Sequence, residues 1–488
     1  MIKPALIGLF CCLALSLAAQ KHDYQWVICW GMAVLDFNED PVKIPETGQT
    51  FPLRENSASI SNEYGQLLFY TNGCEIRGAD YQLIENGDSL NPGFQTDLQC
   101  SGGNIGPQGS LFLPAPSYQD LYYLIHLNFD WIPPHYSVGH WLYYSLVDQS
   151  IGTGKVLDKN HLLLQDTFTV GLITACKHAN GRDWWIVIPE MASNKLYRFL
   201  LDPRGIQGPW EQRIGTVDQD DSHTGQVVFS PDGRYYARMD DYNKLHIYDF
   251  DRCTGLFSNP RFVDIPDSGL TYGVPSSVAF SPNSQLLYAG QIENLYQINM
   301  LVSSIEASLL LVGELDDFEA PFYGYFQKMQ LAPDGKIYLS TGSKPYLNVI
   351  DNPNEKGVAC HFIQHEFLLP DQNYIGLPNM SNYRLGRLEG SPCDSLYLAP
   401  EYPTCLENQL EVFPNPFQKE LHIRFNDCLP GLFDFVLYDV LGRVVWRASF
   451  EGGSFEYPLI LPDLPANVYL YQITQYGEKL KSGKLVKR

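Results

Sequence analysis

Apolar and polar residues alternate in short runs along most of the chain, and Gly, Pro, Asn and Asp separate the runs. Runs of about four to eight residues with a period of two predict β-strands rather than helices. The stretch QVVFSPDGRYYARMD, residues 226–240, is a pair of such runs around a Pro-Asp-Gly turn. The same form returns as SVAFSPNSQLLYAG at 277–290 and KMQLAPDGKIYLST at 328–341. The pattern predicts an all-β protein built from repeated hairpins.

The repeat has a constant period. Ser230, Ser281 and Ala332 occupy the same place before the turn, and each step between them is 51 residues. One further step back reaches Ala179, beside the Asn-Gly turn of KHANGRDWWIVI. In the turn, Pro fixes φ, Asp bonds locally and Gly supplies a positive φ. The turn residues are therefore interpreted as architecture rather than as catalytic groups.

Each later copy is followed by a second pair of amphipathic runs, such as KLHIYDFDRCTG from Lys244, so a unit holds about four strands. Looser copies begin near 57 and 111. Four-stranded units at this period are typical of β-propeller blades, which bury their faces only against neighbouring blades. A β-solenoid would have much shorter rungs. Residues 24–390 are long enough for seven blades, although six copies can be read.

The ends of the chain differ from the repeat. Residues 1–19 have a basic start, an apolar run and a small-residue end, as in a cleavable export signal, and cleavage there would leave Gln20 first. A buried helix fits this order of features poorly, and no stretch is long enough to span a membrane. Residues 391–407 are rich in Pro and Ser and predict a linker. Residues 408–488 alternate again and predict a small immunoglobulin-like β-sandwich.

The net charge of −22 is unevenly distributed. Residues 407–488 carry 9 Lys+Arg and 10 Asp+Glu, so all but one unit of the charge falls on the preceding part. Such a surface repels phosphate backbones, which argues against a nucleic-acid partner, and it favours cations or basic partners. Acidity that serves solubility alone explains the charge equally well.

The chain has 11 cysteines, and nine remain once the predicted signal is removed. An odd number in an exported protein leaves at least one cysteine without an intramolecular partner. Cys393 and Cys405 flank the predicted linker and form the preferred local pair. The other pairings cannot be read from the sequence, and the absence of any CxxC gives no support to a zinc ribbon or a thioredoxin-like site.

The last domain carries specific motifs. They are Pro414-Asn415-Pro416, the strand-turn-strand LYDVLGRVV with Gly442 in its turn, LPANVYLYQI with Tyr469, and the closing GKLVKR with Lys484. In these motifs residues 408–488 resemble the C-terminal sorting domain of type IX secretion (Por secretion tail) of Bacteroidetes-type bacteria. Asn467 stands where that family usually has Gly, and Asn tolerates similar backbone angles.

The resemblance implies an export route and a cellular location. It implies passage through the periplasm, recognition by the outer-membrane translocon and a sorting peptidase, and a final place at the cell surface or in the medium. The repeat region, through LLFYTNGCEI at 67–76 and GLPNMSNY at 376–383, resembles uncharacterised propellers that accompany such tails. That likeness transfers no activity. Anchored and released forms both remain open.

Propellers usually bind ligands at a mouth of the central channel, through the loops that lead into each innermost strand. Here those loops, 217–226, 264–273 and 315–324, are acidic. Carboxylates gathered on one rim would bind Ca²⁺ or a cationic group, whereas solvated loop charges would look the same. Ca²⁺ is thus a possible ligand, and no cofactor is identified. The candidate residues are Asp218, Asp220, Asp221, His223, Asp267, Asp316, Asp317 and Glu319.

A second candidate lies at 128–144, where the step between turns lengthens to about 64 residues. The added segment is aromatic, and aromatic faces stack on sugar rings or on an apolar patch of a partner. Packing of the segment across a neighbouring blade is an equal alternative. The residues concerned are Trp131, His135, Tyr136, His140 and Trp141.

One motif suggests an enzyme. Gly87-Asp88-Ser89-Leu90 spells a signature of GDSL-type esterases, but the Ser is expected in a turn of a β repeat, far from the strand-to-helix site such a nucleophile needs. The sequence therefore favours an exported binding or interaction protein with an unknown glycan or protein ligand. The alternative is a secreted hydrolase or lyase acting on a polymer, with carboxylates at the channel mouth as acid and base.

Overall fold

The computed structural model describes residues 20–45, 47–130, 138–217, 225–240, 244–266, 276–316, 325–373, 376–394, 410–425, 431–452, 456–475 and 478–488. The predicted export signal 1–19 lies outside these residues, as does the predicted linker from 395 onward. Within the described part, no helix is long and apolar enough to cross a membrane.

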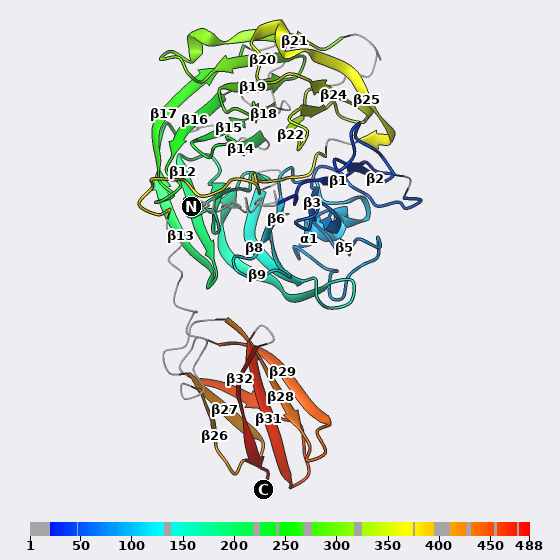
Figure 1. Ribbon diagram of the computed structural model, residues 1–488, viewed down its shortest axis with the longest axis vertical. Helices are drawn as coiled ribbons and strands as arrows, with labels where there is room; N and C mark the ends of the chain where they lie inside the picture. The colour runs from blue at the N-terminus through cyan, green and yellow to red at the C-terminus, as the bar shows by residue number, and fades with distance from the viewer. Residues whose placement is uncertain are drawn as a thin grey trace, which may run out of the picture.

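Seven antiparallel sheets follow one another in the described part of residues 20–373 and stand around a ring (Figure 1). The first has two strands and the second three. The other five have the four strands predicted. In chain order the sheets are β1 (Gln25–Ile28) and β2 (Ala33–Asp36); β3 (Ala58–Ser61), β4 (Leu67–Thr71) and β5 (Ile76–Gly78); β6 (Ser110–Pro114), β7 (Leu121–Asp130), β8 (Val138–Asp148) and β9 (Lys155–Phe168); β10 (Thr174–Lys177), β11 (Trp184–Pro189), β12 (Lys195–Asp202) and β13 (Gly205–Arg213); β14 (Gly225–Phe229), β15 (Tyr235–Asp240), β16 (Lys244–Phe250) and β17 (Phe257–Asp264); β18 (Ser276–Phe280), β19 (Leu286–Gln291), β20 (Asn294–Asn299) and β21 (Leu310–Glu314); and β22 (Lys328–Leu331), β23 (Ile337–Ser340), β24 (Lys344–Ile350) and β25 (Phe362–Asn373).

The all-β class and the propeller predicted from the period are confirmed. The described helices are short and lie between strands: α1 (Phe94–Gln99) and η1 (Cys100–Gly102) precede β6, η2 (Glu306–Ser308) precedes β21, and η3 (Gly357–Cys360) precedes β25. His365 lies within β25, and His361 directly precedes that strand.

The core lies between adjacent sheets. Leu245 and Ile247 of one sheet pack in a single buried cluster with Leu287 and Ile298 of the next. Burying one such side chain stabilises the fold by about 1.5–3 kcal/mol. The first strands β14, β18 and β22 contact one another in order, so they form the inner wall of the ring. Each sheet therefore depends on its neighbours, as the repeat predicted.

The turn chemistry predicted for the repeat is present. Ser230 Oγ donates to Asp232 Oδ1 over 2.6 Å, and Gly233 has a φ of +72°. In the next copy Ser281 Oγ donates to Asn283 Oδ1 over 2.8 Å. These bonds lie within the turn itself, which explains why the same letters recur. Asp232 N and Asn283 N also donate to Ser284 Oγ and Asn354 Oδ1 of other sheets.

The segment 376–394 has no regular strand and crosses the ring (Figure 1, gold). Asn379 N donates to Ser57 O over 2.8 Å, and Tyr383 Oη donates to Phe112 O over the same distance, so the segment follows the inner strands. Further along, Leu388 N donates to Ala179 O at the turn end of another sheet. We call residues 376–394 the strap. The strap holds sheets that are far apart in sequence.

The strap ends in a disulfide between Cys393 and Cys253. This corrects the predicted local pair Cys393–Cys405. The physical reason is that the strap brings Cys393 back over the propeller, next to a turn 140 residues earlier in the chain. A second disulfide joins Cys74 and Cys100. Among the described residues the free cysteines, all of them buried, are Cys29, Cys176 and Cys360.

The C-terminal domain is a sandwich of two sheets, as predicted. One sheet has the order β26-β27-β30 and the other β29-β28-β31-β32. Phe435 of one strand stacks on Tyr471 of its neighbour, with ring centroids 5.5 Å apart, inside a buried cluster. The strands are β26 (Leu410–Phe413), β27 (Glu420–Phe425), β28 (Gly431–Tyr438), β29 (Val444–Gly452), β30 (Glu456–Ile460), β31 (Val468–Gln475) and β32 (Glu478–Val486).

Candidate functional site

Three buried amide side chains join the inner strands at the centre of the ring. Gln108 Oε1 accepts from Val227 N at 2.8 Å, and Gln108 Nε2 donates to Val227 O at 2.9 Å. Asn379 of the strap donates to Ser110 O at 3.0 Å and to Ile173 O at 2.9 Å, and it accepts from Gln108 at 3.1 Å. These contacts tie the strap to three sheets at once.

Gln226 continues this network to the remaining inner strands. Its Oε1 accepts from Val278 N and from Met329 N, each at 3.1 Å, and its Nε2 donates to Met329 O. Gln108, Gln226 and Asn379 thus form a layer of amides, which we call the amide floor, across the inner edges of five successive sheets. Each backbone group that accepts or donates there is satisfied in a site away from water.

A cavity of about 460 Å³ lies at the centre of the ring, on the side of the repeated turns. Val227 and Met329, whose backbones bind the amide floor, also line this cavity, so the floor lies at its inner end. Strap residues, among them Met380 and Leu385, form one wall. The cavity is therefore bounded by inner strands, repeated turns and the strap.

The repeat itself builds most of the other walls. Phe229, Phe280 and Leu331, at equivalent positions 51 residues apart, all line the cavity. Two residues further on, the prolines of the three turns line it as well. These are Pro231, Pro282 and Pro333. The lining is therefore largely apolar, as in most small-molecule sites.

The polar side chains of the wall are those of Asp23, Thr174, Gln330, Ser381, Asn382 and Arg384. Arg384 Nη1 donates to both carboxylate oxygens of Asp23, 2.6 Å from Oδ2. Burial raises the pKa of Asp23, and the Arg384 charge opposes that shift. Ser381 also lines the cavity, and its buried Oγ makes no hydrogen bond within the described residues. Gln330 donates from Nε2 to Leu331 O at 3.3 Å, which is a contact within its own strand.

Most of the predicted acidic rim lies outside the described residues, namely Asp218, Asp220, Asp221, His223, Asp267, Asp317 and Glu319. Asp316 is described, and both its carboxylate oxygens lie about 3 Å from His365 Nε2, at 3.0 and 3.1 Å. Within the described residues no group of three or more His, Cys, Asp or Glu side chains is placed to hold a metal ion. The acidic rim and its Ca²⁺ stay predictions.

Of the aromatic candidates, too, only some belong to the described residues. Trp131, His135 and Tyr136 lie outside the described residues. His140 and Trp141 belong to strand β8 rather than to a loop, and their rings meet edge to face with centroids 4.4 Å apart. Trp141 N donates to Asn128 Oδ1 at 2.8 Å across the hairpin. Much of the extra length predicted here as an insertion is used to extend β7 and β8.

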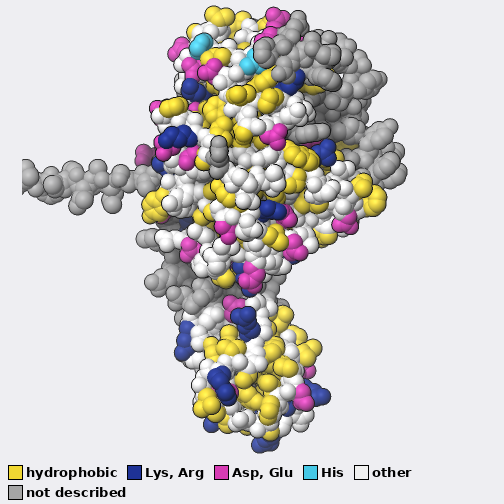
Figure 2. All heavy atoms as spheres, turned by 90° about the vertical axis from the view of Figure 1, so that its right-hand side faces the viewer, with side chains coloured by type: hydrophobic (Ala, Val, Ile, Leu, Met, Phe, Trp, Pro, Cys, Tyr) yellow, Lys and Arg dark blue, Asp and Glu magenta, His cyan; other side chains and the backbone are white. Residues whose placement is uncertain are grey.

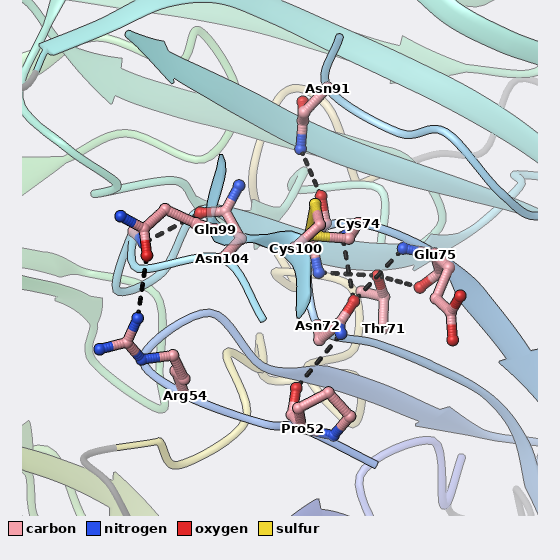
Figure 3. Close-up of a disulfide and its surroundings, with 12 residues drawn as sticks. Pro52, Arg54, Thr71, Asn72, Cys74, Glu75, Asn91, Gln99, Cys100 and Asn104 are labelled. Carbon is pink, nitrogen blue, oxygen red and sulfur yellow. Dashed lines mark hydrogen bonds between the residues drawn. A yellow bond between two sulfur atoms is a disulfide. The ribbon is translucent and has the colours of Figure 1, made fainter. Parts of the chain in front are cut away.

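Ser89 lies in a cleft beside the disulfide Cys74–Cys100, whose surroundings are shown in Figure 3. Its Oγ donates to Asp88 Oδ2 at 3.2 Å, and Lys159 donates to the same aspartate. The nearest chain segment is anchored by Asn91, which donates to Gly73 O (Figure 3) and lies 2.6 Å from His126 Nδ1. Among the described residues, the recorded hydrogen-bond partner of the Ser89 hydroxyl is Asp88 rather than a histidine.

The predicted sorting residues surround the last strand. Asn415 Nδ2 donates to Lys484 O, and Asn415 Oδ1 accepts from Val486 N, both at 2.9 Å. Asn415 follows Pro414 and precedes Pro416, so the motif clamps the final residues of β32. Gly442 has a φ of +79° in the hairpin turn, and Tyr469 Oη donates to Pro465 O at 2.8 Å.

Sequence reasoning missed the strap and the turn-side cavity. The strap residues carry no periodic pattern, and their partners lie up to 271 residues away, as for Tyr383 and Phe112. One signal was present. The prolines of the repeat were recognised as turn formers, and their 51-residue spacing placed them on one face of the ring. The period therefore predicts that this face lines the centre of the ring.

Residues 411–488 match the family model described as the secretion system C-terminal sorting domain. The C-terminal domain therefore belongs to that family, as its motifs predicted. A chain with this type IX sorting domain is directed to the cell surface or the extracellular space. No curated protein matches the chain.

Solved structures resemble the propeller only distantly. A functionally unknown protein from Desulfotomaculum acetoxidans is 12% identical, with a TM-score of 0.41, and the match covers 74% of this chain and all of that one. A periplasmic gluconolactonase of Pseudomonas aeruginosa is 11% identical with a TM-score of 0.45, covering 72% and 98%. The Cps50 (Swd1) β-propeller domain of Myceliophteria thermophila is 9% identical with a TM-score of 0.35, covering 66% and 91%. None of these likenesses carries a function to this chain.

Proposed function

We propose that this exported protein is a binding protein whose propeller holds its ligand in the turn-side cavity. The carrying observation is the composition of the cavity wall. It is apolar along the inner strands and turns apart from Thr174 and Gln330, and its described charged residues, Asp23 and Arg384, neutralise each other. Such a site gives a ligand apolar contact and a few orienting hydrogen bonds.

The same wall argues for binding rather than hydrolysis. Glycoside and ester hydrolysis need an acid and a base with separated pKa values, or a nucleophile with a base beside it. Asp23 is the described carboxylate of the cavity, and both its oxygens accept from Arg384. It is therefore engaged in an ion pair rather than aimed at a reacting atom. Surface attachment or release after sorting belongs to the same proposal.

A cavity-filling variant tests the proposal. Gln330→Trp places a large ring in the cavity, so a ligand that binds there should stabilise the original protein and leave the variant unchanged. The measurement is a thermal-shift screen of the purified full chain with neutral, anionic and cationic small molecules and with soluble polysaccharides, because a ligand of the native state raises Tm. Ligands that stabilise both proteins equally would place the binding site elsewhere and overturn the proposal.

A further inference from the structure

Among the lining positions shared by the three repeats that build the cavity wall, one differs in polarity. Val228, Ala279 and Gln330 are equivalent residues 51 apart, and all three line the cavity. Two are apolar, as the wall requires, and the third is an amide. The architecture of the blade is satisfied without a polar group at this position, because two of three copies lack one. Gln330 therefore adds something that the fold does not need.

A second polar group of the lining belongs to the strap. Ser381 of the strap is 7% exposed, and its Oγ has no hydrogen-bond partner among the described residues. A buried hydroxyl without a partner is unfavourable, so such groups are rare in folded proteins. Both Ser381 and Gln330 line the same cavity. Together they offer donors and acceptors that the protein itself does not use, apart from the one bond of Gln330 to Leu331 O.

The charge of the site restricts the ligand. Asp23 and Arg384 are the charged residues among the described lining, and they form an ion pair with each other. An ion bound there would lose its hydration without gaining an opposite charge, which is unfavourable. The chain as a whole carries −22, which repels anions further. A neutral ligand fits best.

The shape of the wall restricts it as well. A volume of about 460 Å³ is in the lower part of the range for small-molecule sites. Phe229 and Phe280 offer aromatic surface, and Pro231, Pro282 and Pro333 offer saturated apolar rings. Rings pack well against such surfaces.

From these observations we infer that the cavity binds an uncharged ring compound with one or two hydrogen-bonding groups, and that Gln330 and Ser381 bind those groups. The inference rests on the proposed binding function and names its ligand class. Gln330 and Ser381 are then the residues that determine specificity, and the apolar walls supply most of the affinity.

Three probes of equal size test the ligand class on the purified full chain by titration calorimetry. They are 2-phenylethanol, phenylacetate and 2-phenylethylamine, which are neutral, negative and positive. We expect 2-phenylethanol to bind at least about tenfold more tightly than either ion, since each buried, unpaired charge is costly. Equal or tighter binding of an ion, sensitive to Gln330→Trp, would overturn the ligand class and leave the proposed function standing.

Two variants test the named residues. Gln330→Val introduces the residue found at the equivalent position of the copy at 226–240, so this variant should fold. Ser381→Ala removes one hydroxyl. Each should weaken binding of 2-phenylethanol about five- to tenfold, which corresponds to one hydrogen bond. The exposed Gln82→Ala is the matched control and should bind as the original protein does. Binding of 2-phenylethanol unchanged in both cavity variants would refute their role. No binding of any probe by a folded original protein would count against the ligand class, and the wider screen would then decide the proposed function.

Discussion

At the scale of single residues, the fold depends on buried polar side chains, each of which has defined hydrogen-bond partners. His126 in β7 is fully buried, with Nδ1 2.6 Å from Asn91 Oδ1 and Nε2 2.9 Å from Ser145 Oγ. Burial lowers the pKa of this histidine from 6.5 to about 3. Burial also lowers the pKa of His22 to about 4. Both residues are therefore neutral in the folded protein near pH 7, and protonating them costs stability.

The sign of the resulting pH dependence is clear. The folded-state pKa is below the unfolded one, so at low pH the unfolded chain binds a proton that the folded chain excludes. Stability is full above pH 6.5 and falls by about 1.4 kcal/mol per pH unit and per histidine as the pH drops towards the folded pKa. Between pH 7.5 and 5, we expect the free energy of unfolding of His126→Asn to fall by about 2 kcal/mol less than that of the original protein. Urea unfolding at several pH values measures this, and identical slopes would refute it.

Residues also mark the limits of what the sequence could predict. Ser89 was recognised as a turn residue because Asn-Gly precedes it nearby, and that interpretation needs only local chemistry. The partner of Cys393 could not be found in this way. Cys253 lies 140 residues earlier in the chain, and the path of the strap brings the two cysteines together. Gln330 stands out only when the three repeat copies are compared in the knowledge that they surround one cavity.

At the scale of elements, the repeat and the strap do different work. The period of 51 residues was readable because each hairpin carries its own turn residues and its own alternating strands. The amide floor was not readable, since Gln108 and Val227 are 119 residues apart and Gln226 and Met329 are 103 apart. Contacts of that separation are a property of the closed ring, so they leave no periodic signal in any one element.

Gln226 provides a direct test of the amide floor. Gln226→Leu leaves the N–H groups of Val278 and Met329 without their acceptor in a buried site, and the free energy of unfolding should fall by about 2–4 kcal/mol. Chemical denaturation followed by tryptophan fluorescence measures the change. The exposed Gln82→Ala should stay within about 0.5 kcal/mol of the original protein. Equal stability of the two variants would show that the floor adds nothing to the fold.

The strap disulfide is expected to stabilise more than the other one. The sequence separation is 140 for Cys253–Cys393 and 26 for Cys74–Cys100. In the chain-entropy model the two cross-links contribute about 5 and about 3.5 kcal/mol. Urea unfolding of the two Cys→Ser double variants should therefore place the strap variant lower, with faster hydrogen exchange in residues 380–386. The reverse order, with unchanged exchange there, would contradict the structural role given to the strap.

At the scale of the whole molecule, two domains have separate tasks and separate surfaces. The propeller carries nearly all of the negative charge, whereas the C-terminal domain is almost neutral. In the view of Figure 2 hydrophobic side chains gather on the C-terminal domain among Lys and Arg. Its exposed hydrophobic residues include Val440, Leu441 and Val444, which flank the Gly442 turn. Exposed hydrophobic side chains of this kind are typical of a surface that binds another protein.

Sorting is expected to depend on how the C-terminal strand is held. Deleting residues 410–488 should leave the propeller in the periplasm, because the sorting domain is then missing. Asn415→Ala should act in the same direction but less completely, since it removes the two bonds to Lys484 O and Val486 N that fix the end of β32. The exposed Lys419→Ala is the matched control. Fractionation of cells into periplasm, surface and medium measures each variant. Normal export of the deletion variant would refute sorting by this domain, whereas normal export of Asn415→Ala alone would show that the translocon recognises other features of the sandwich.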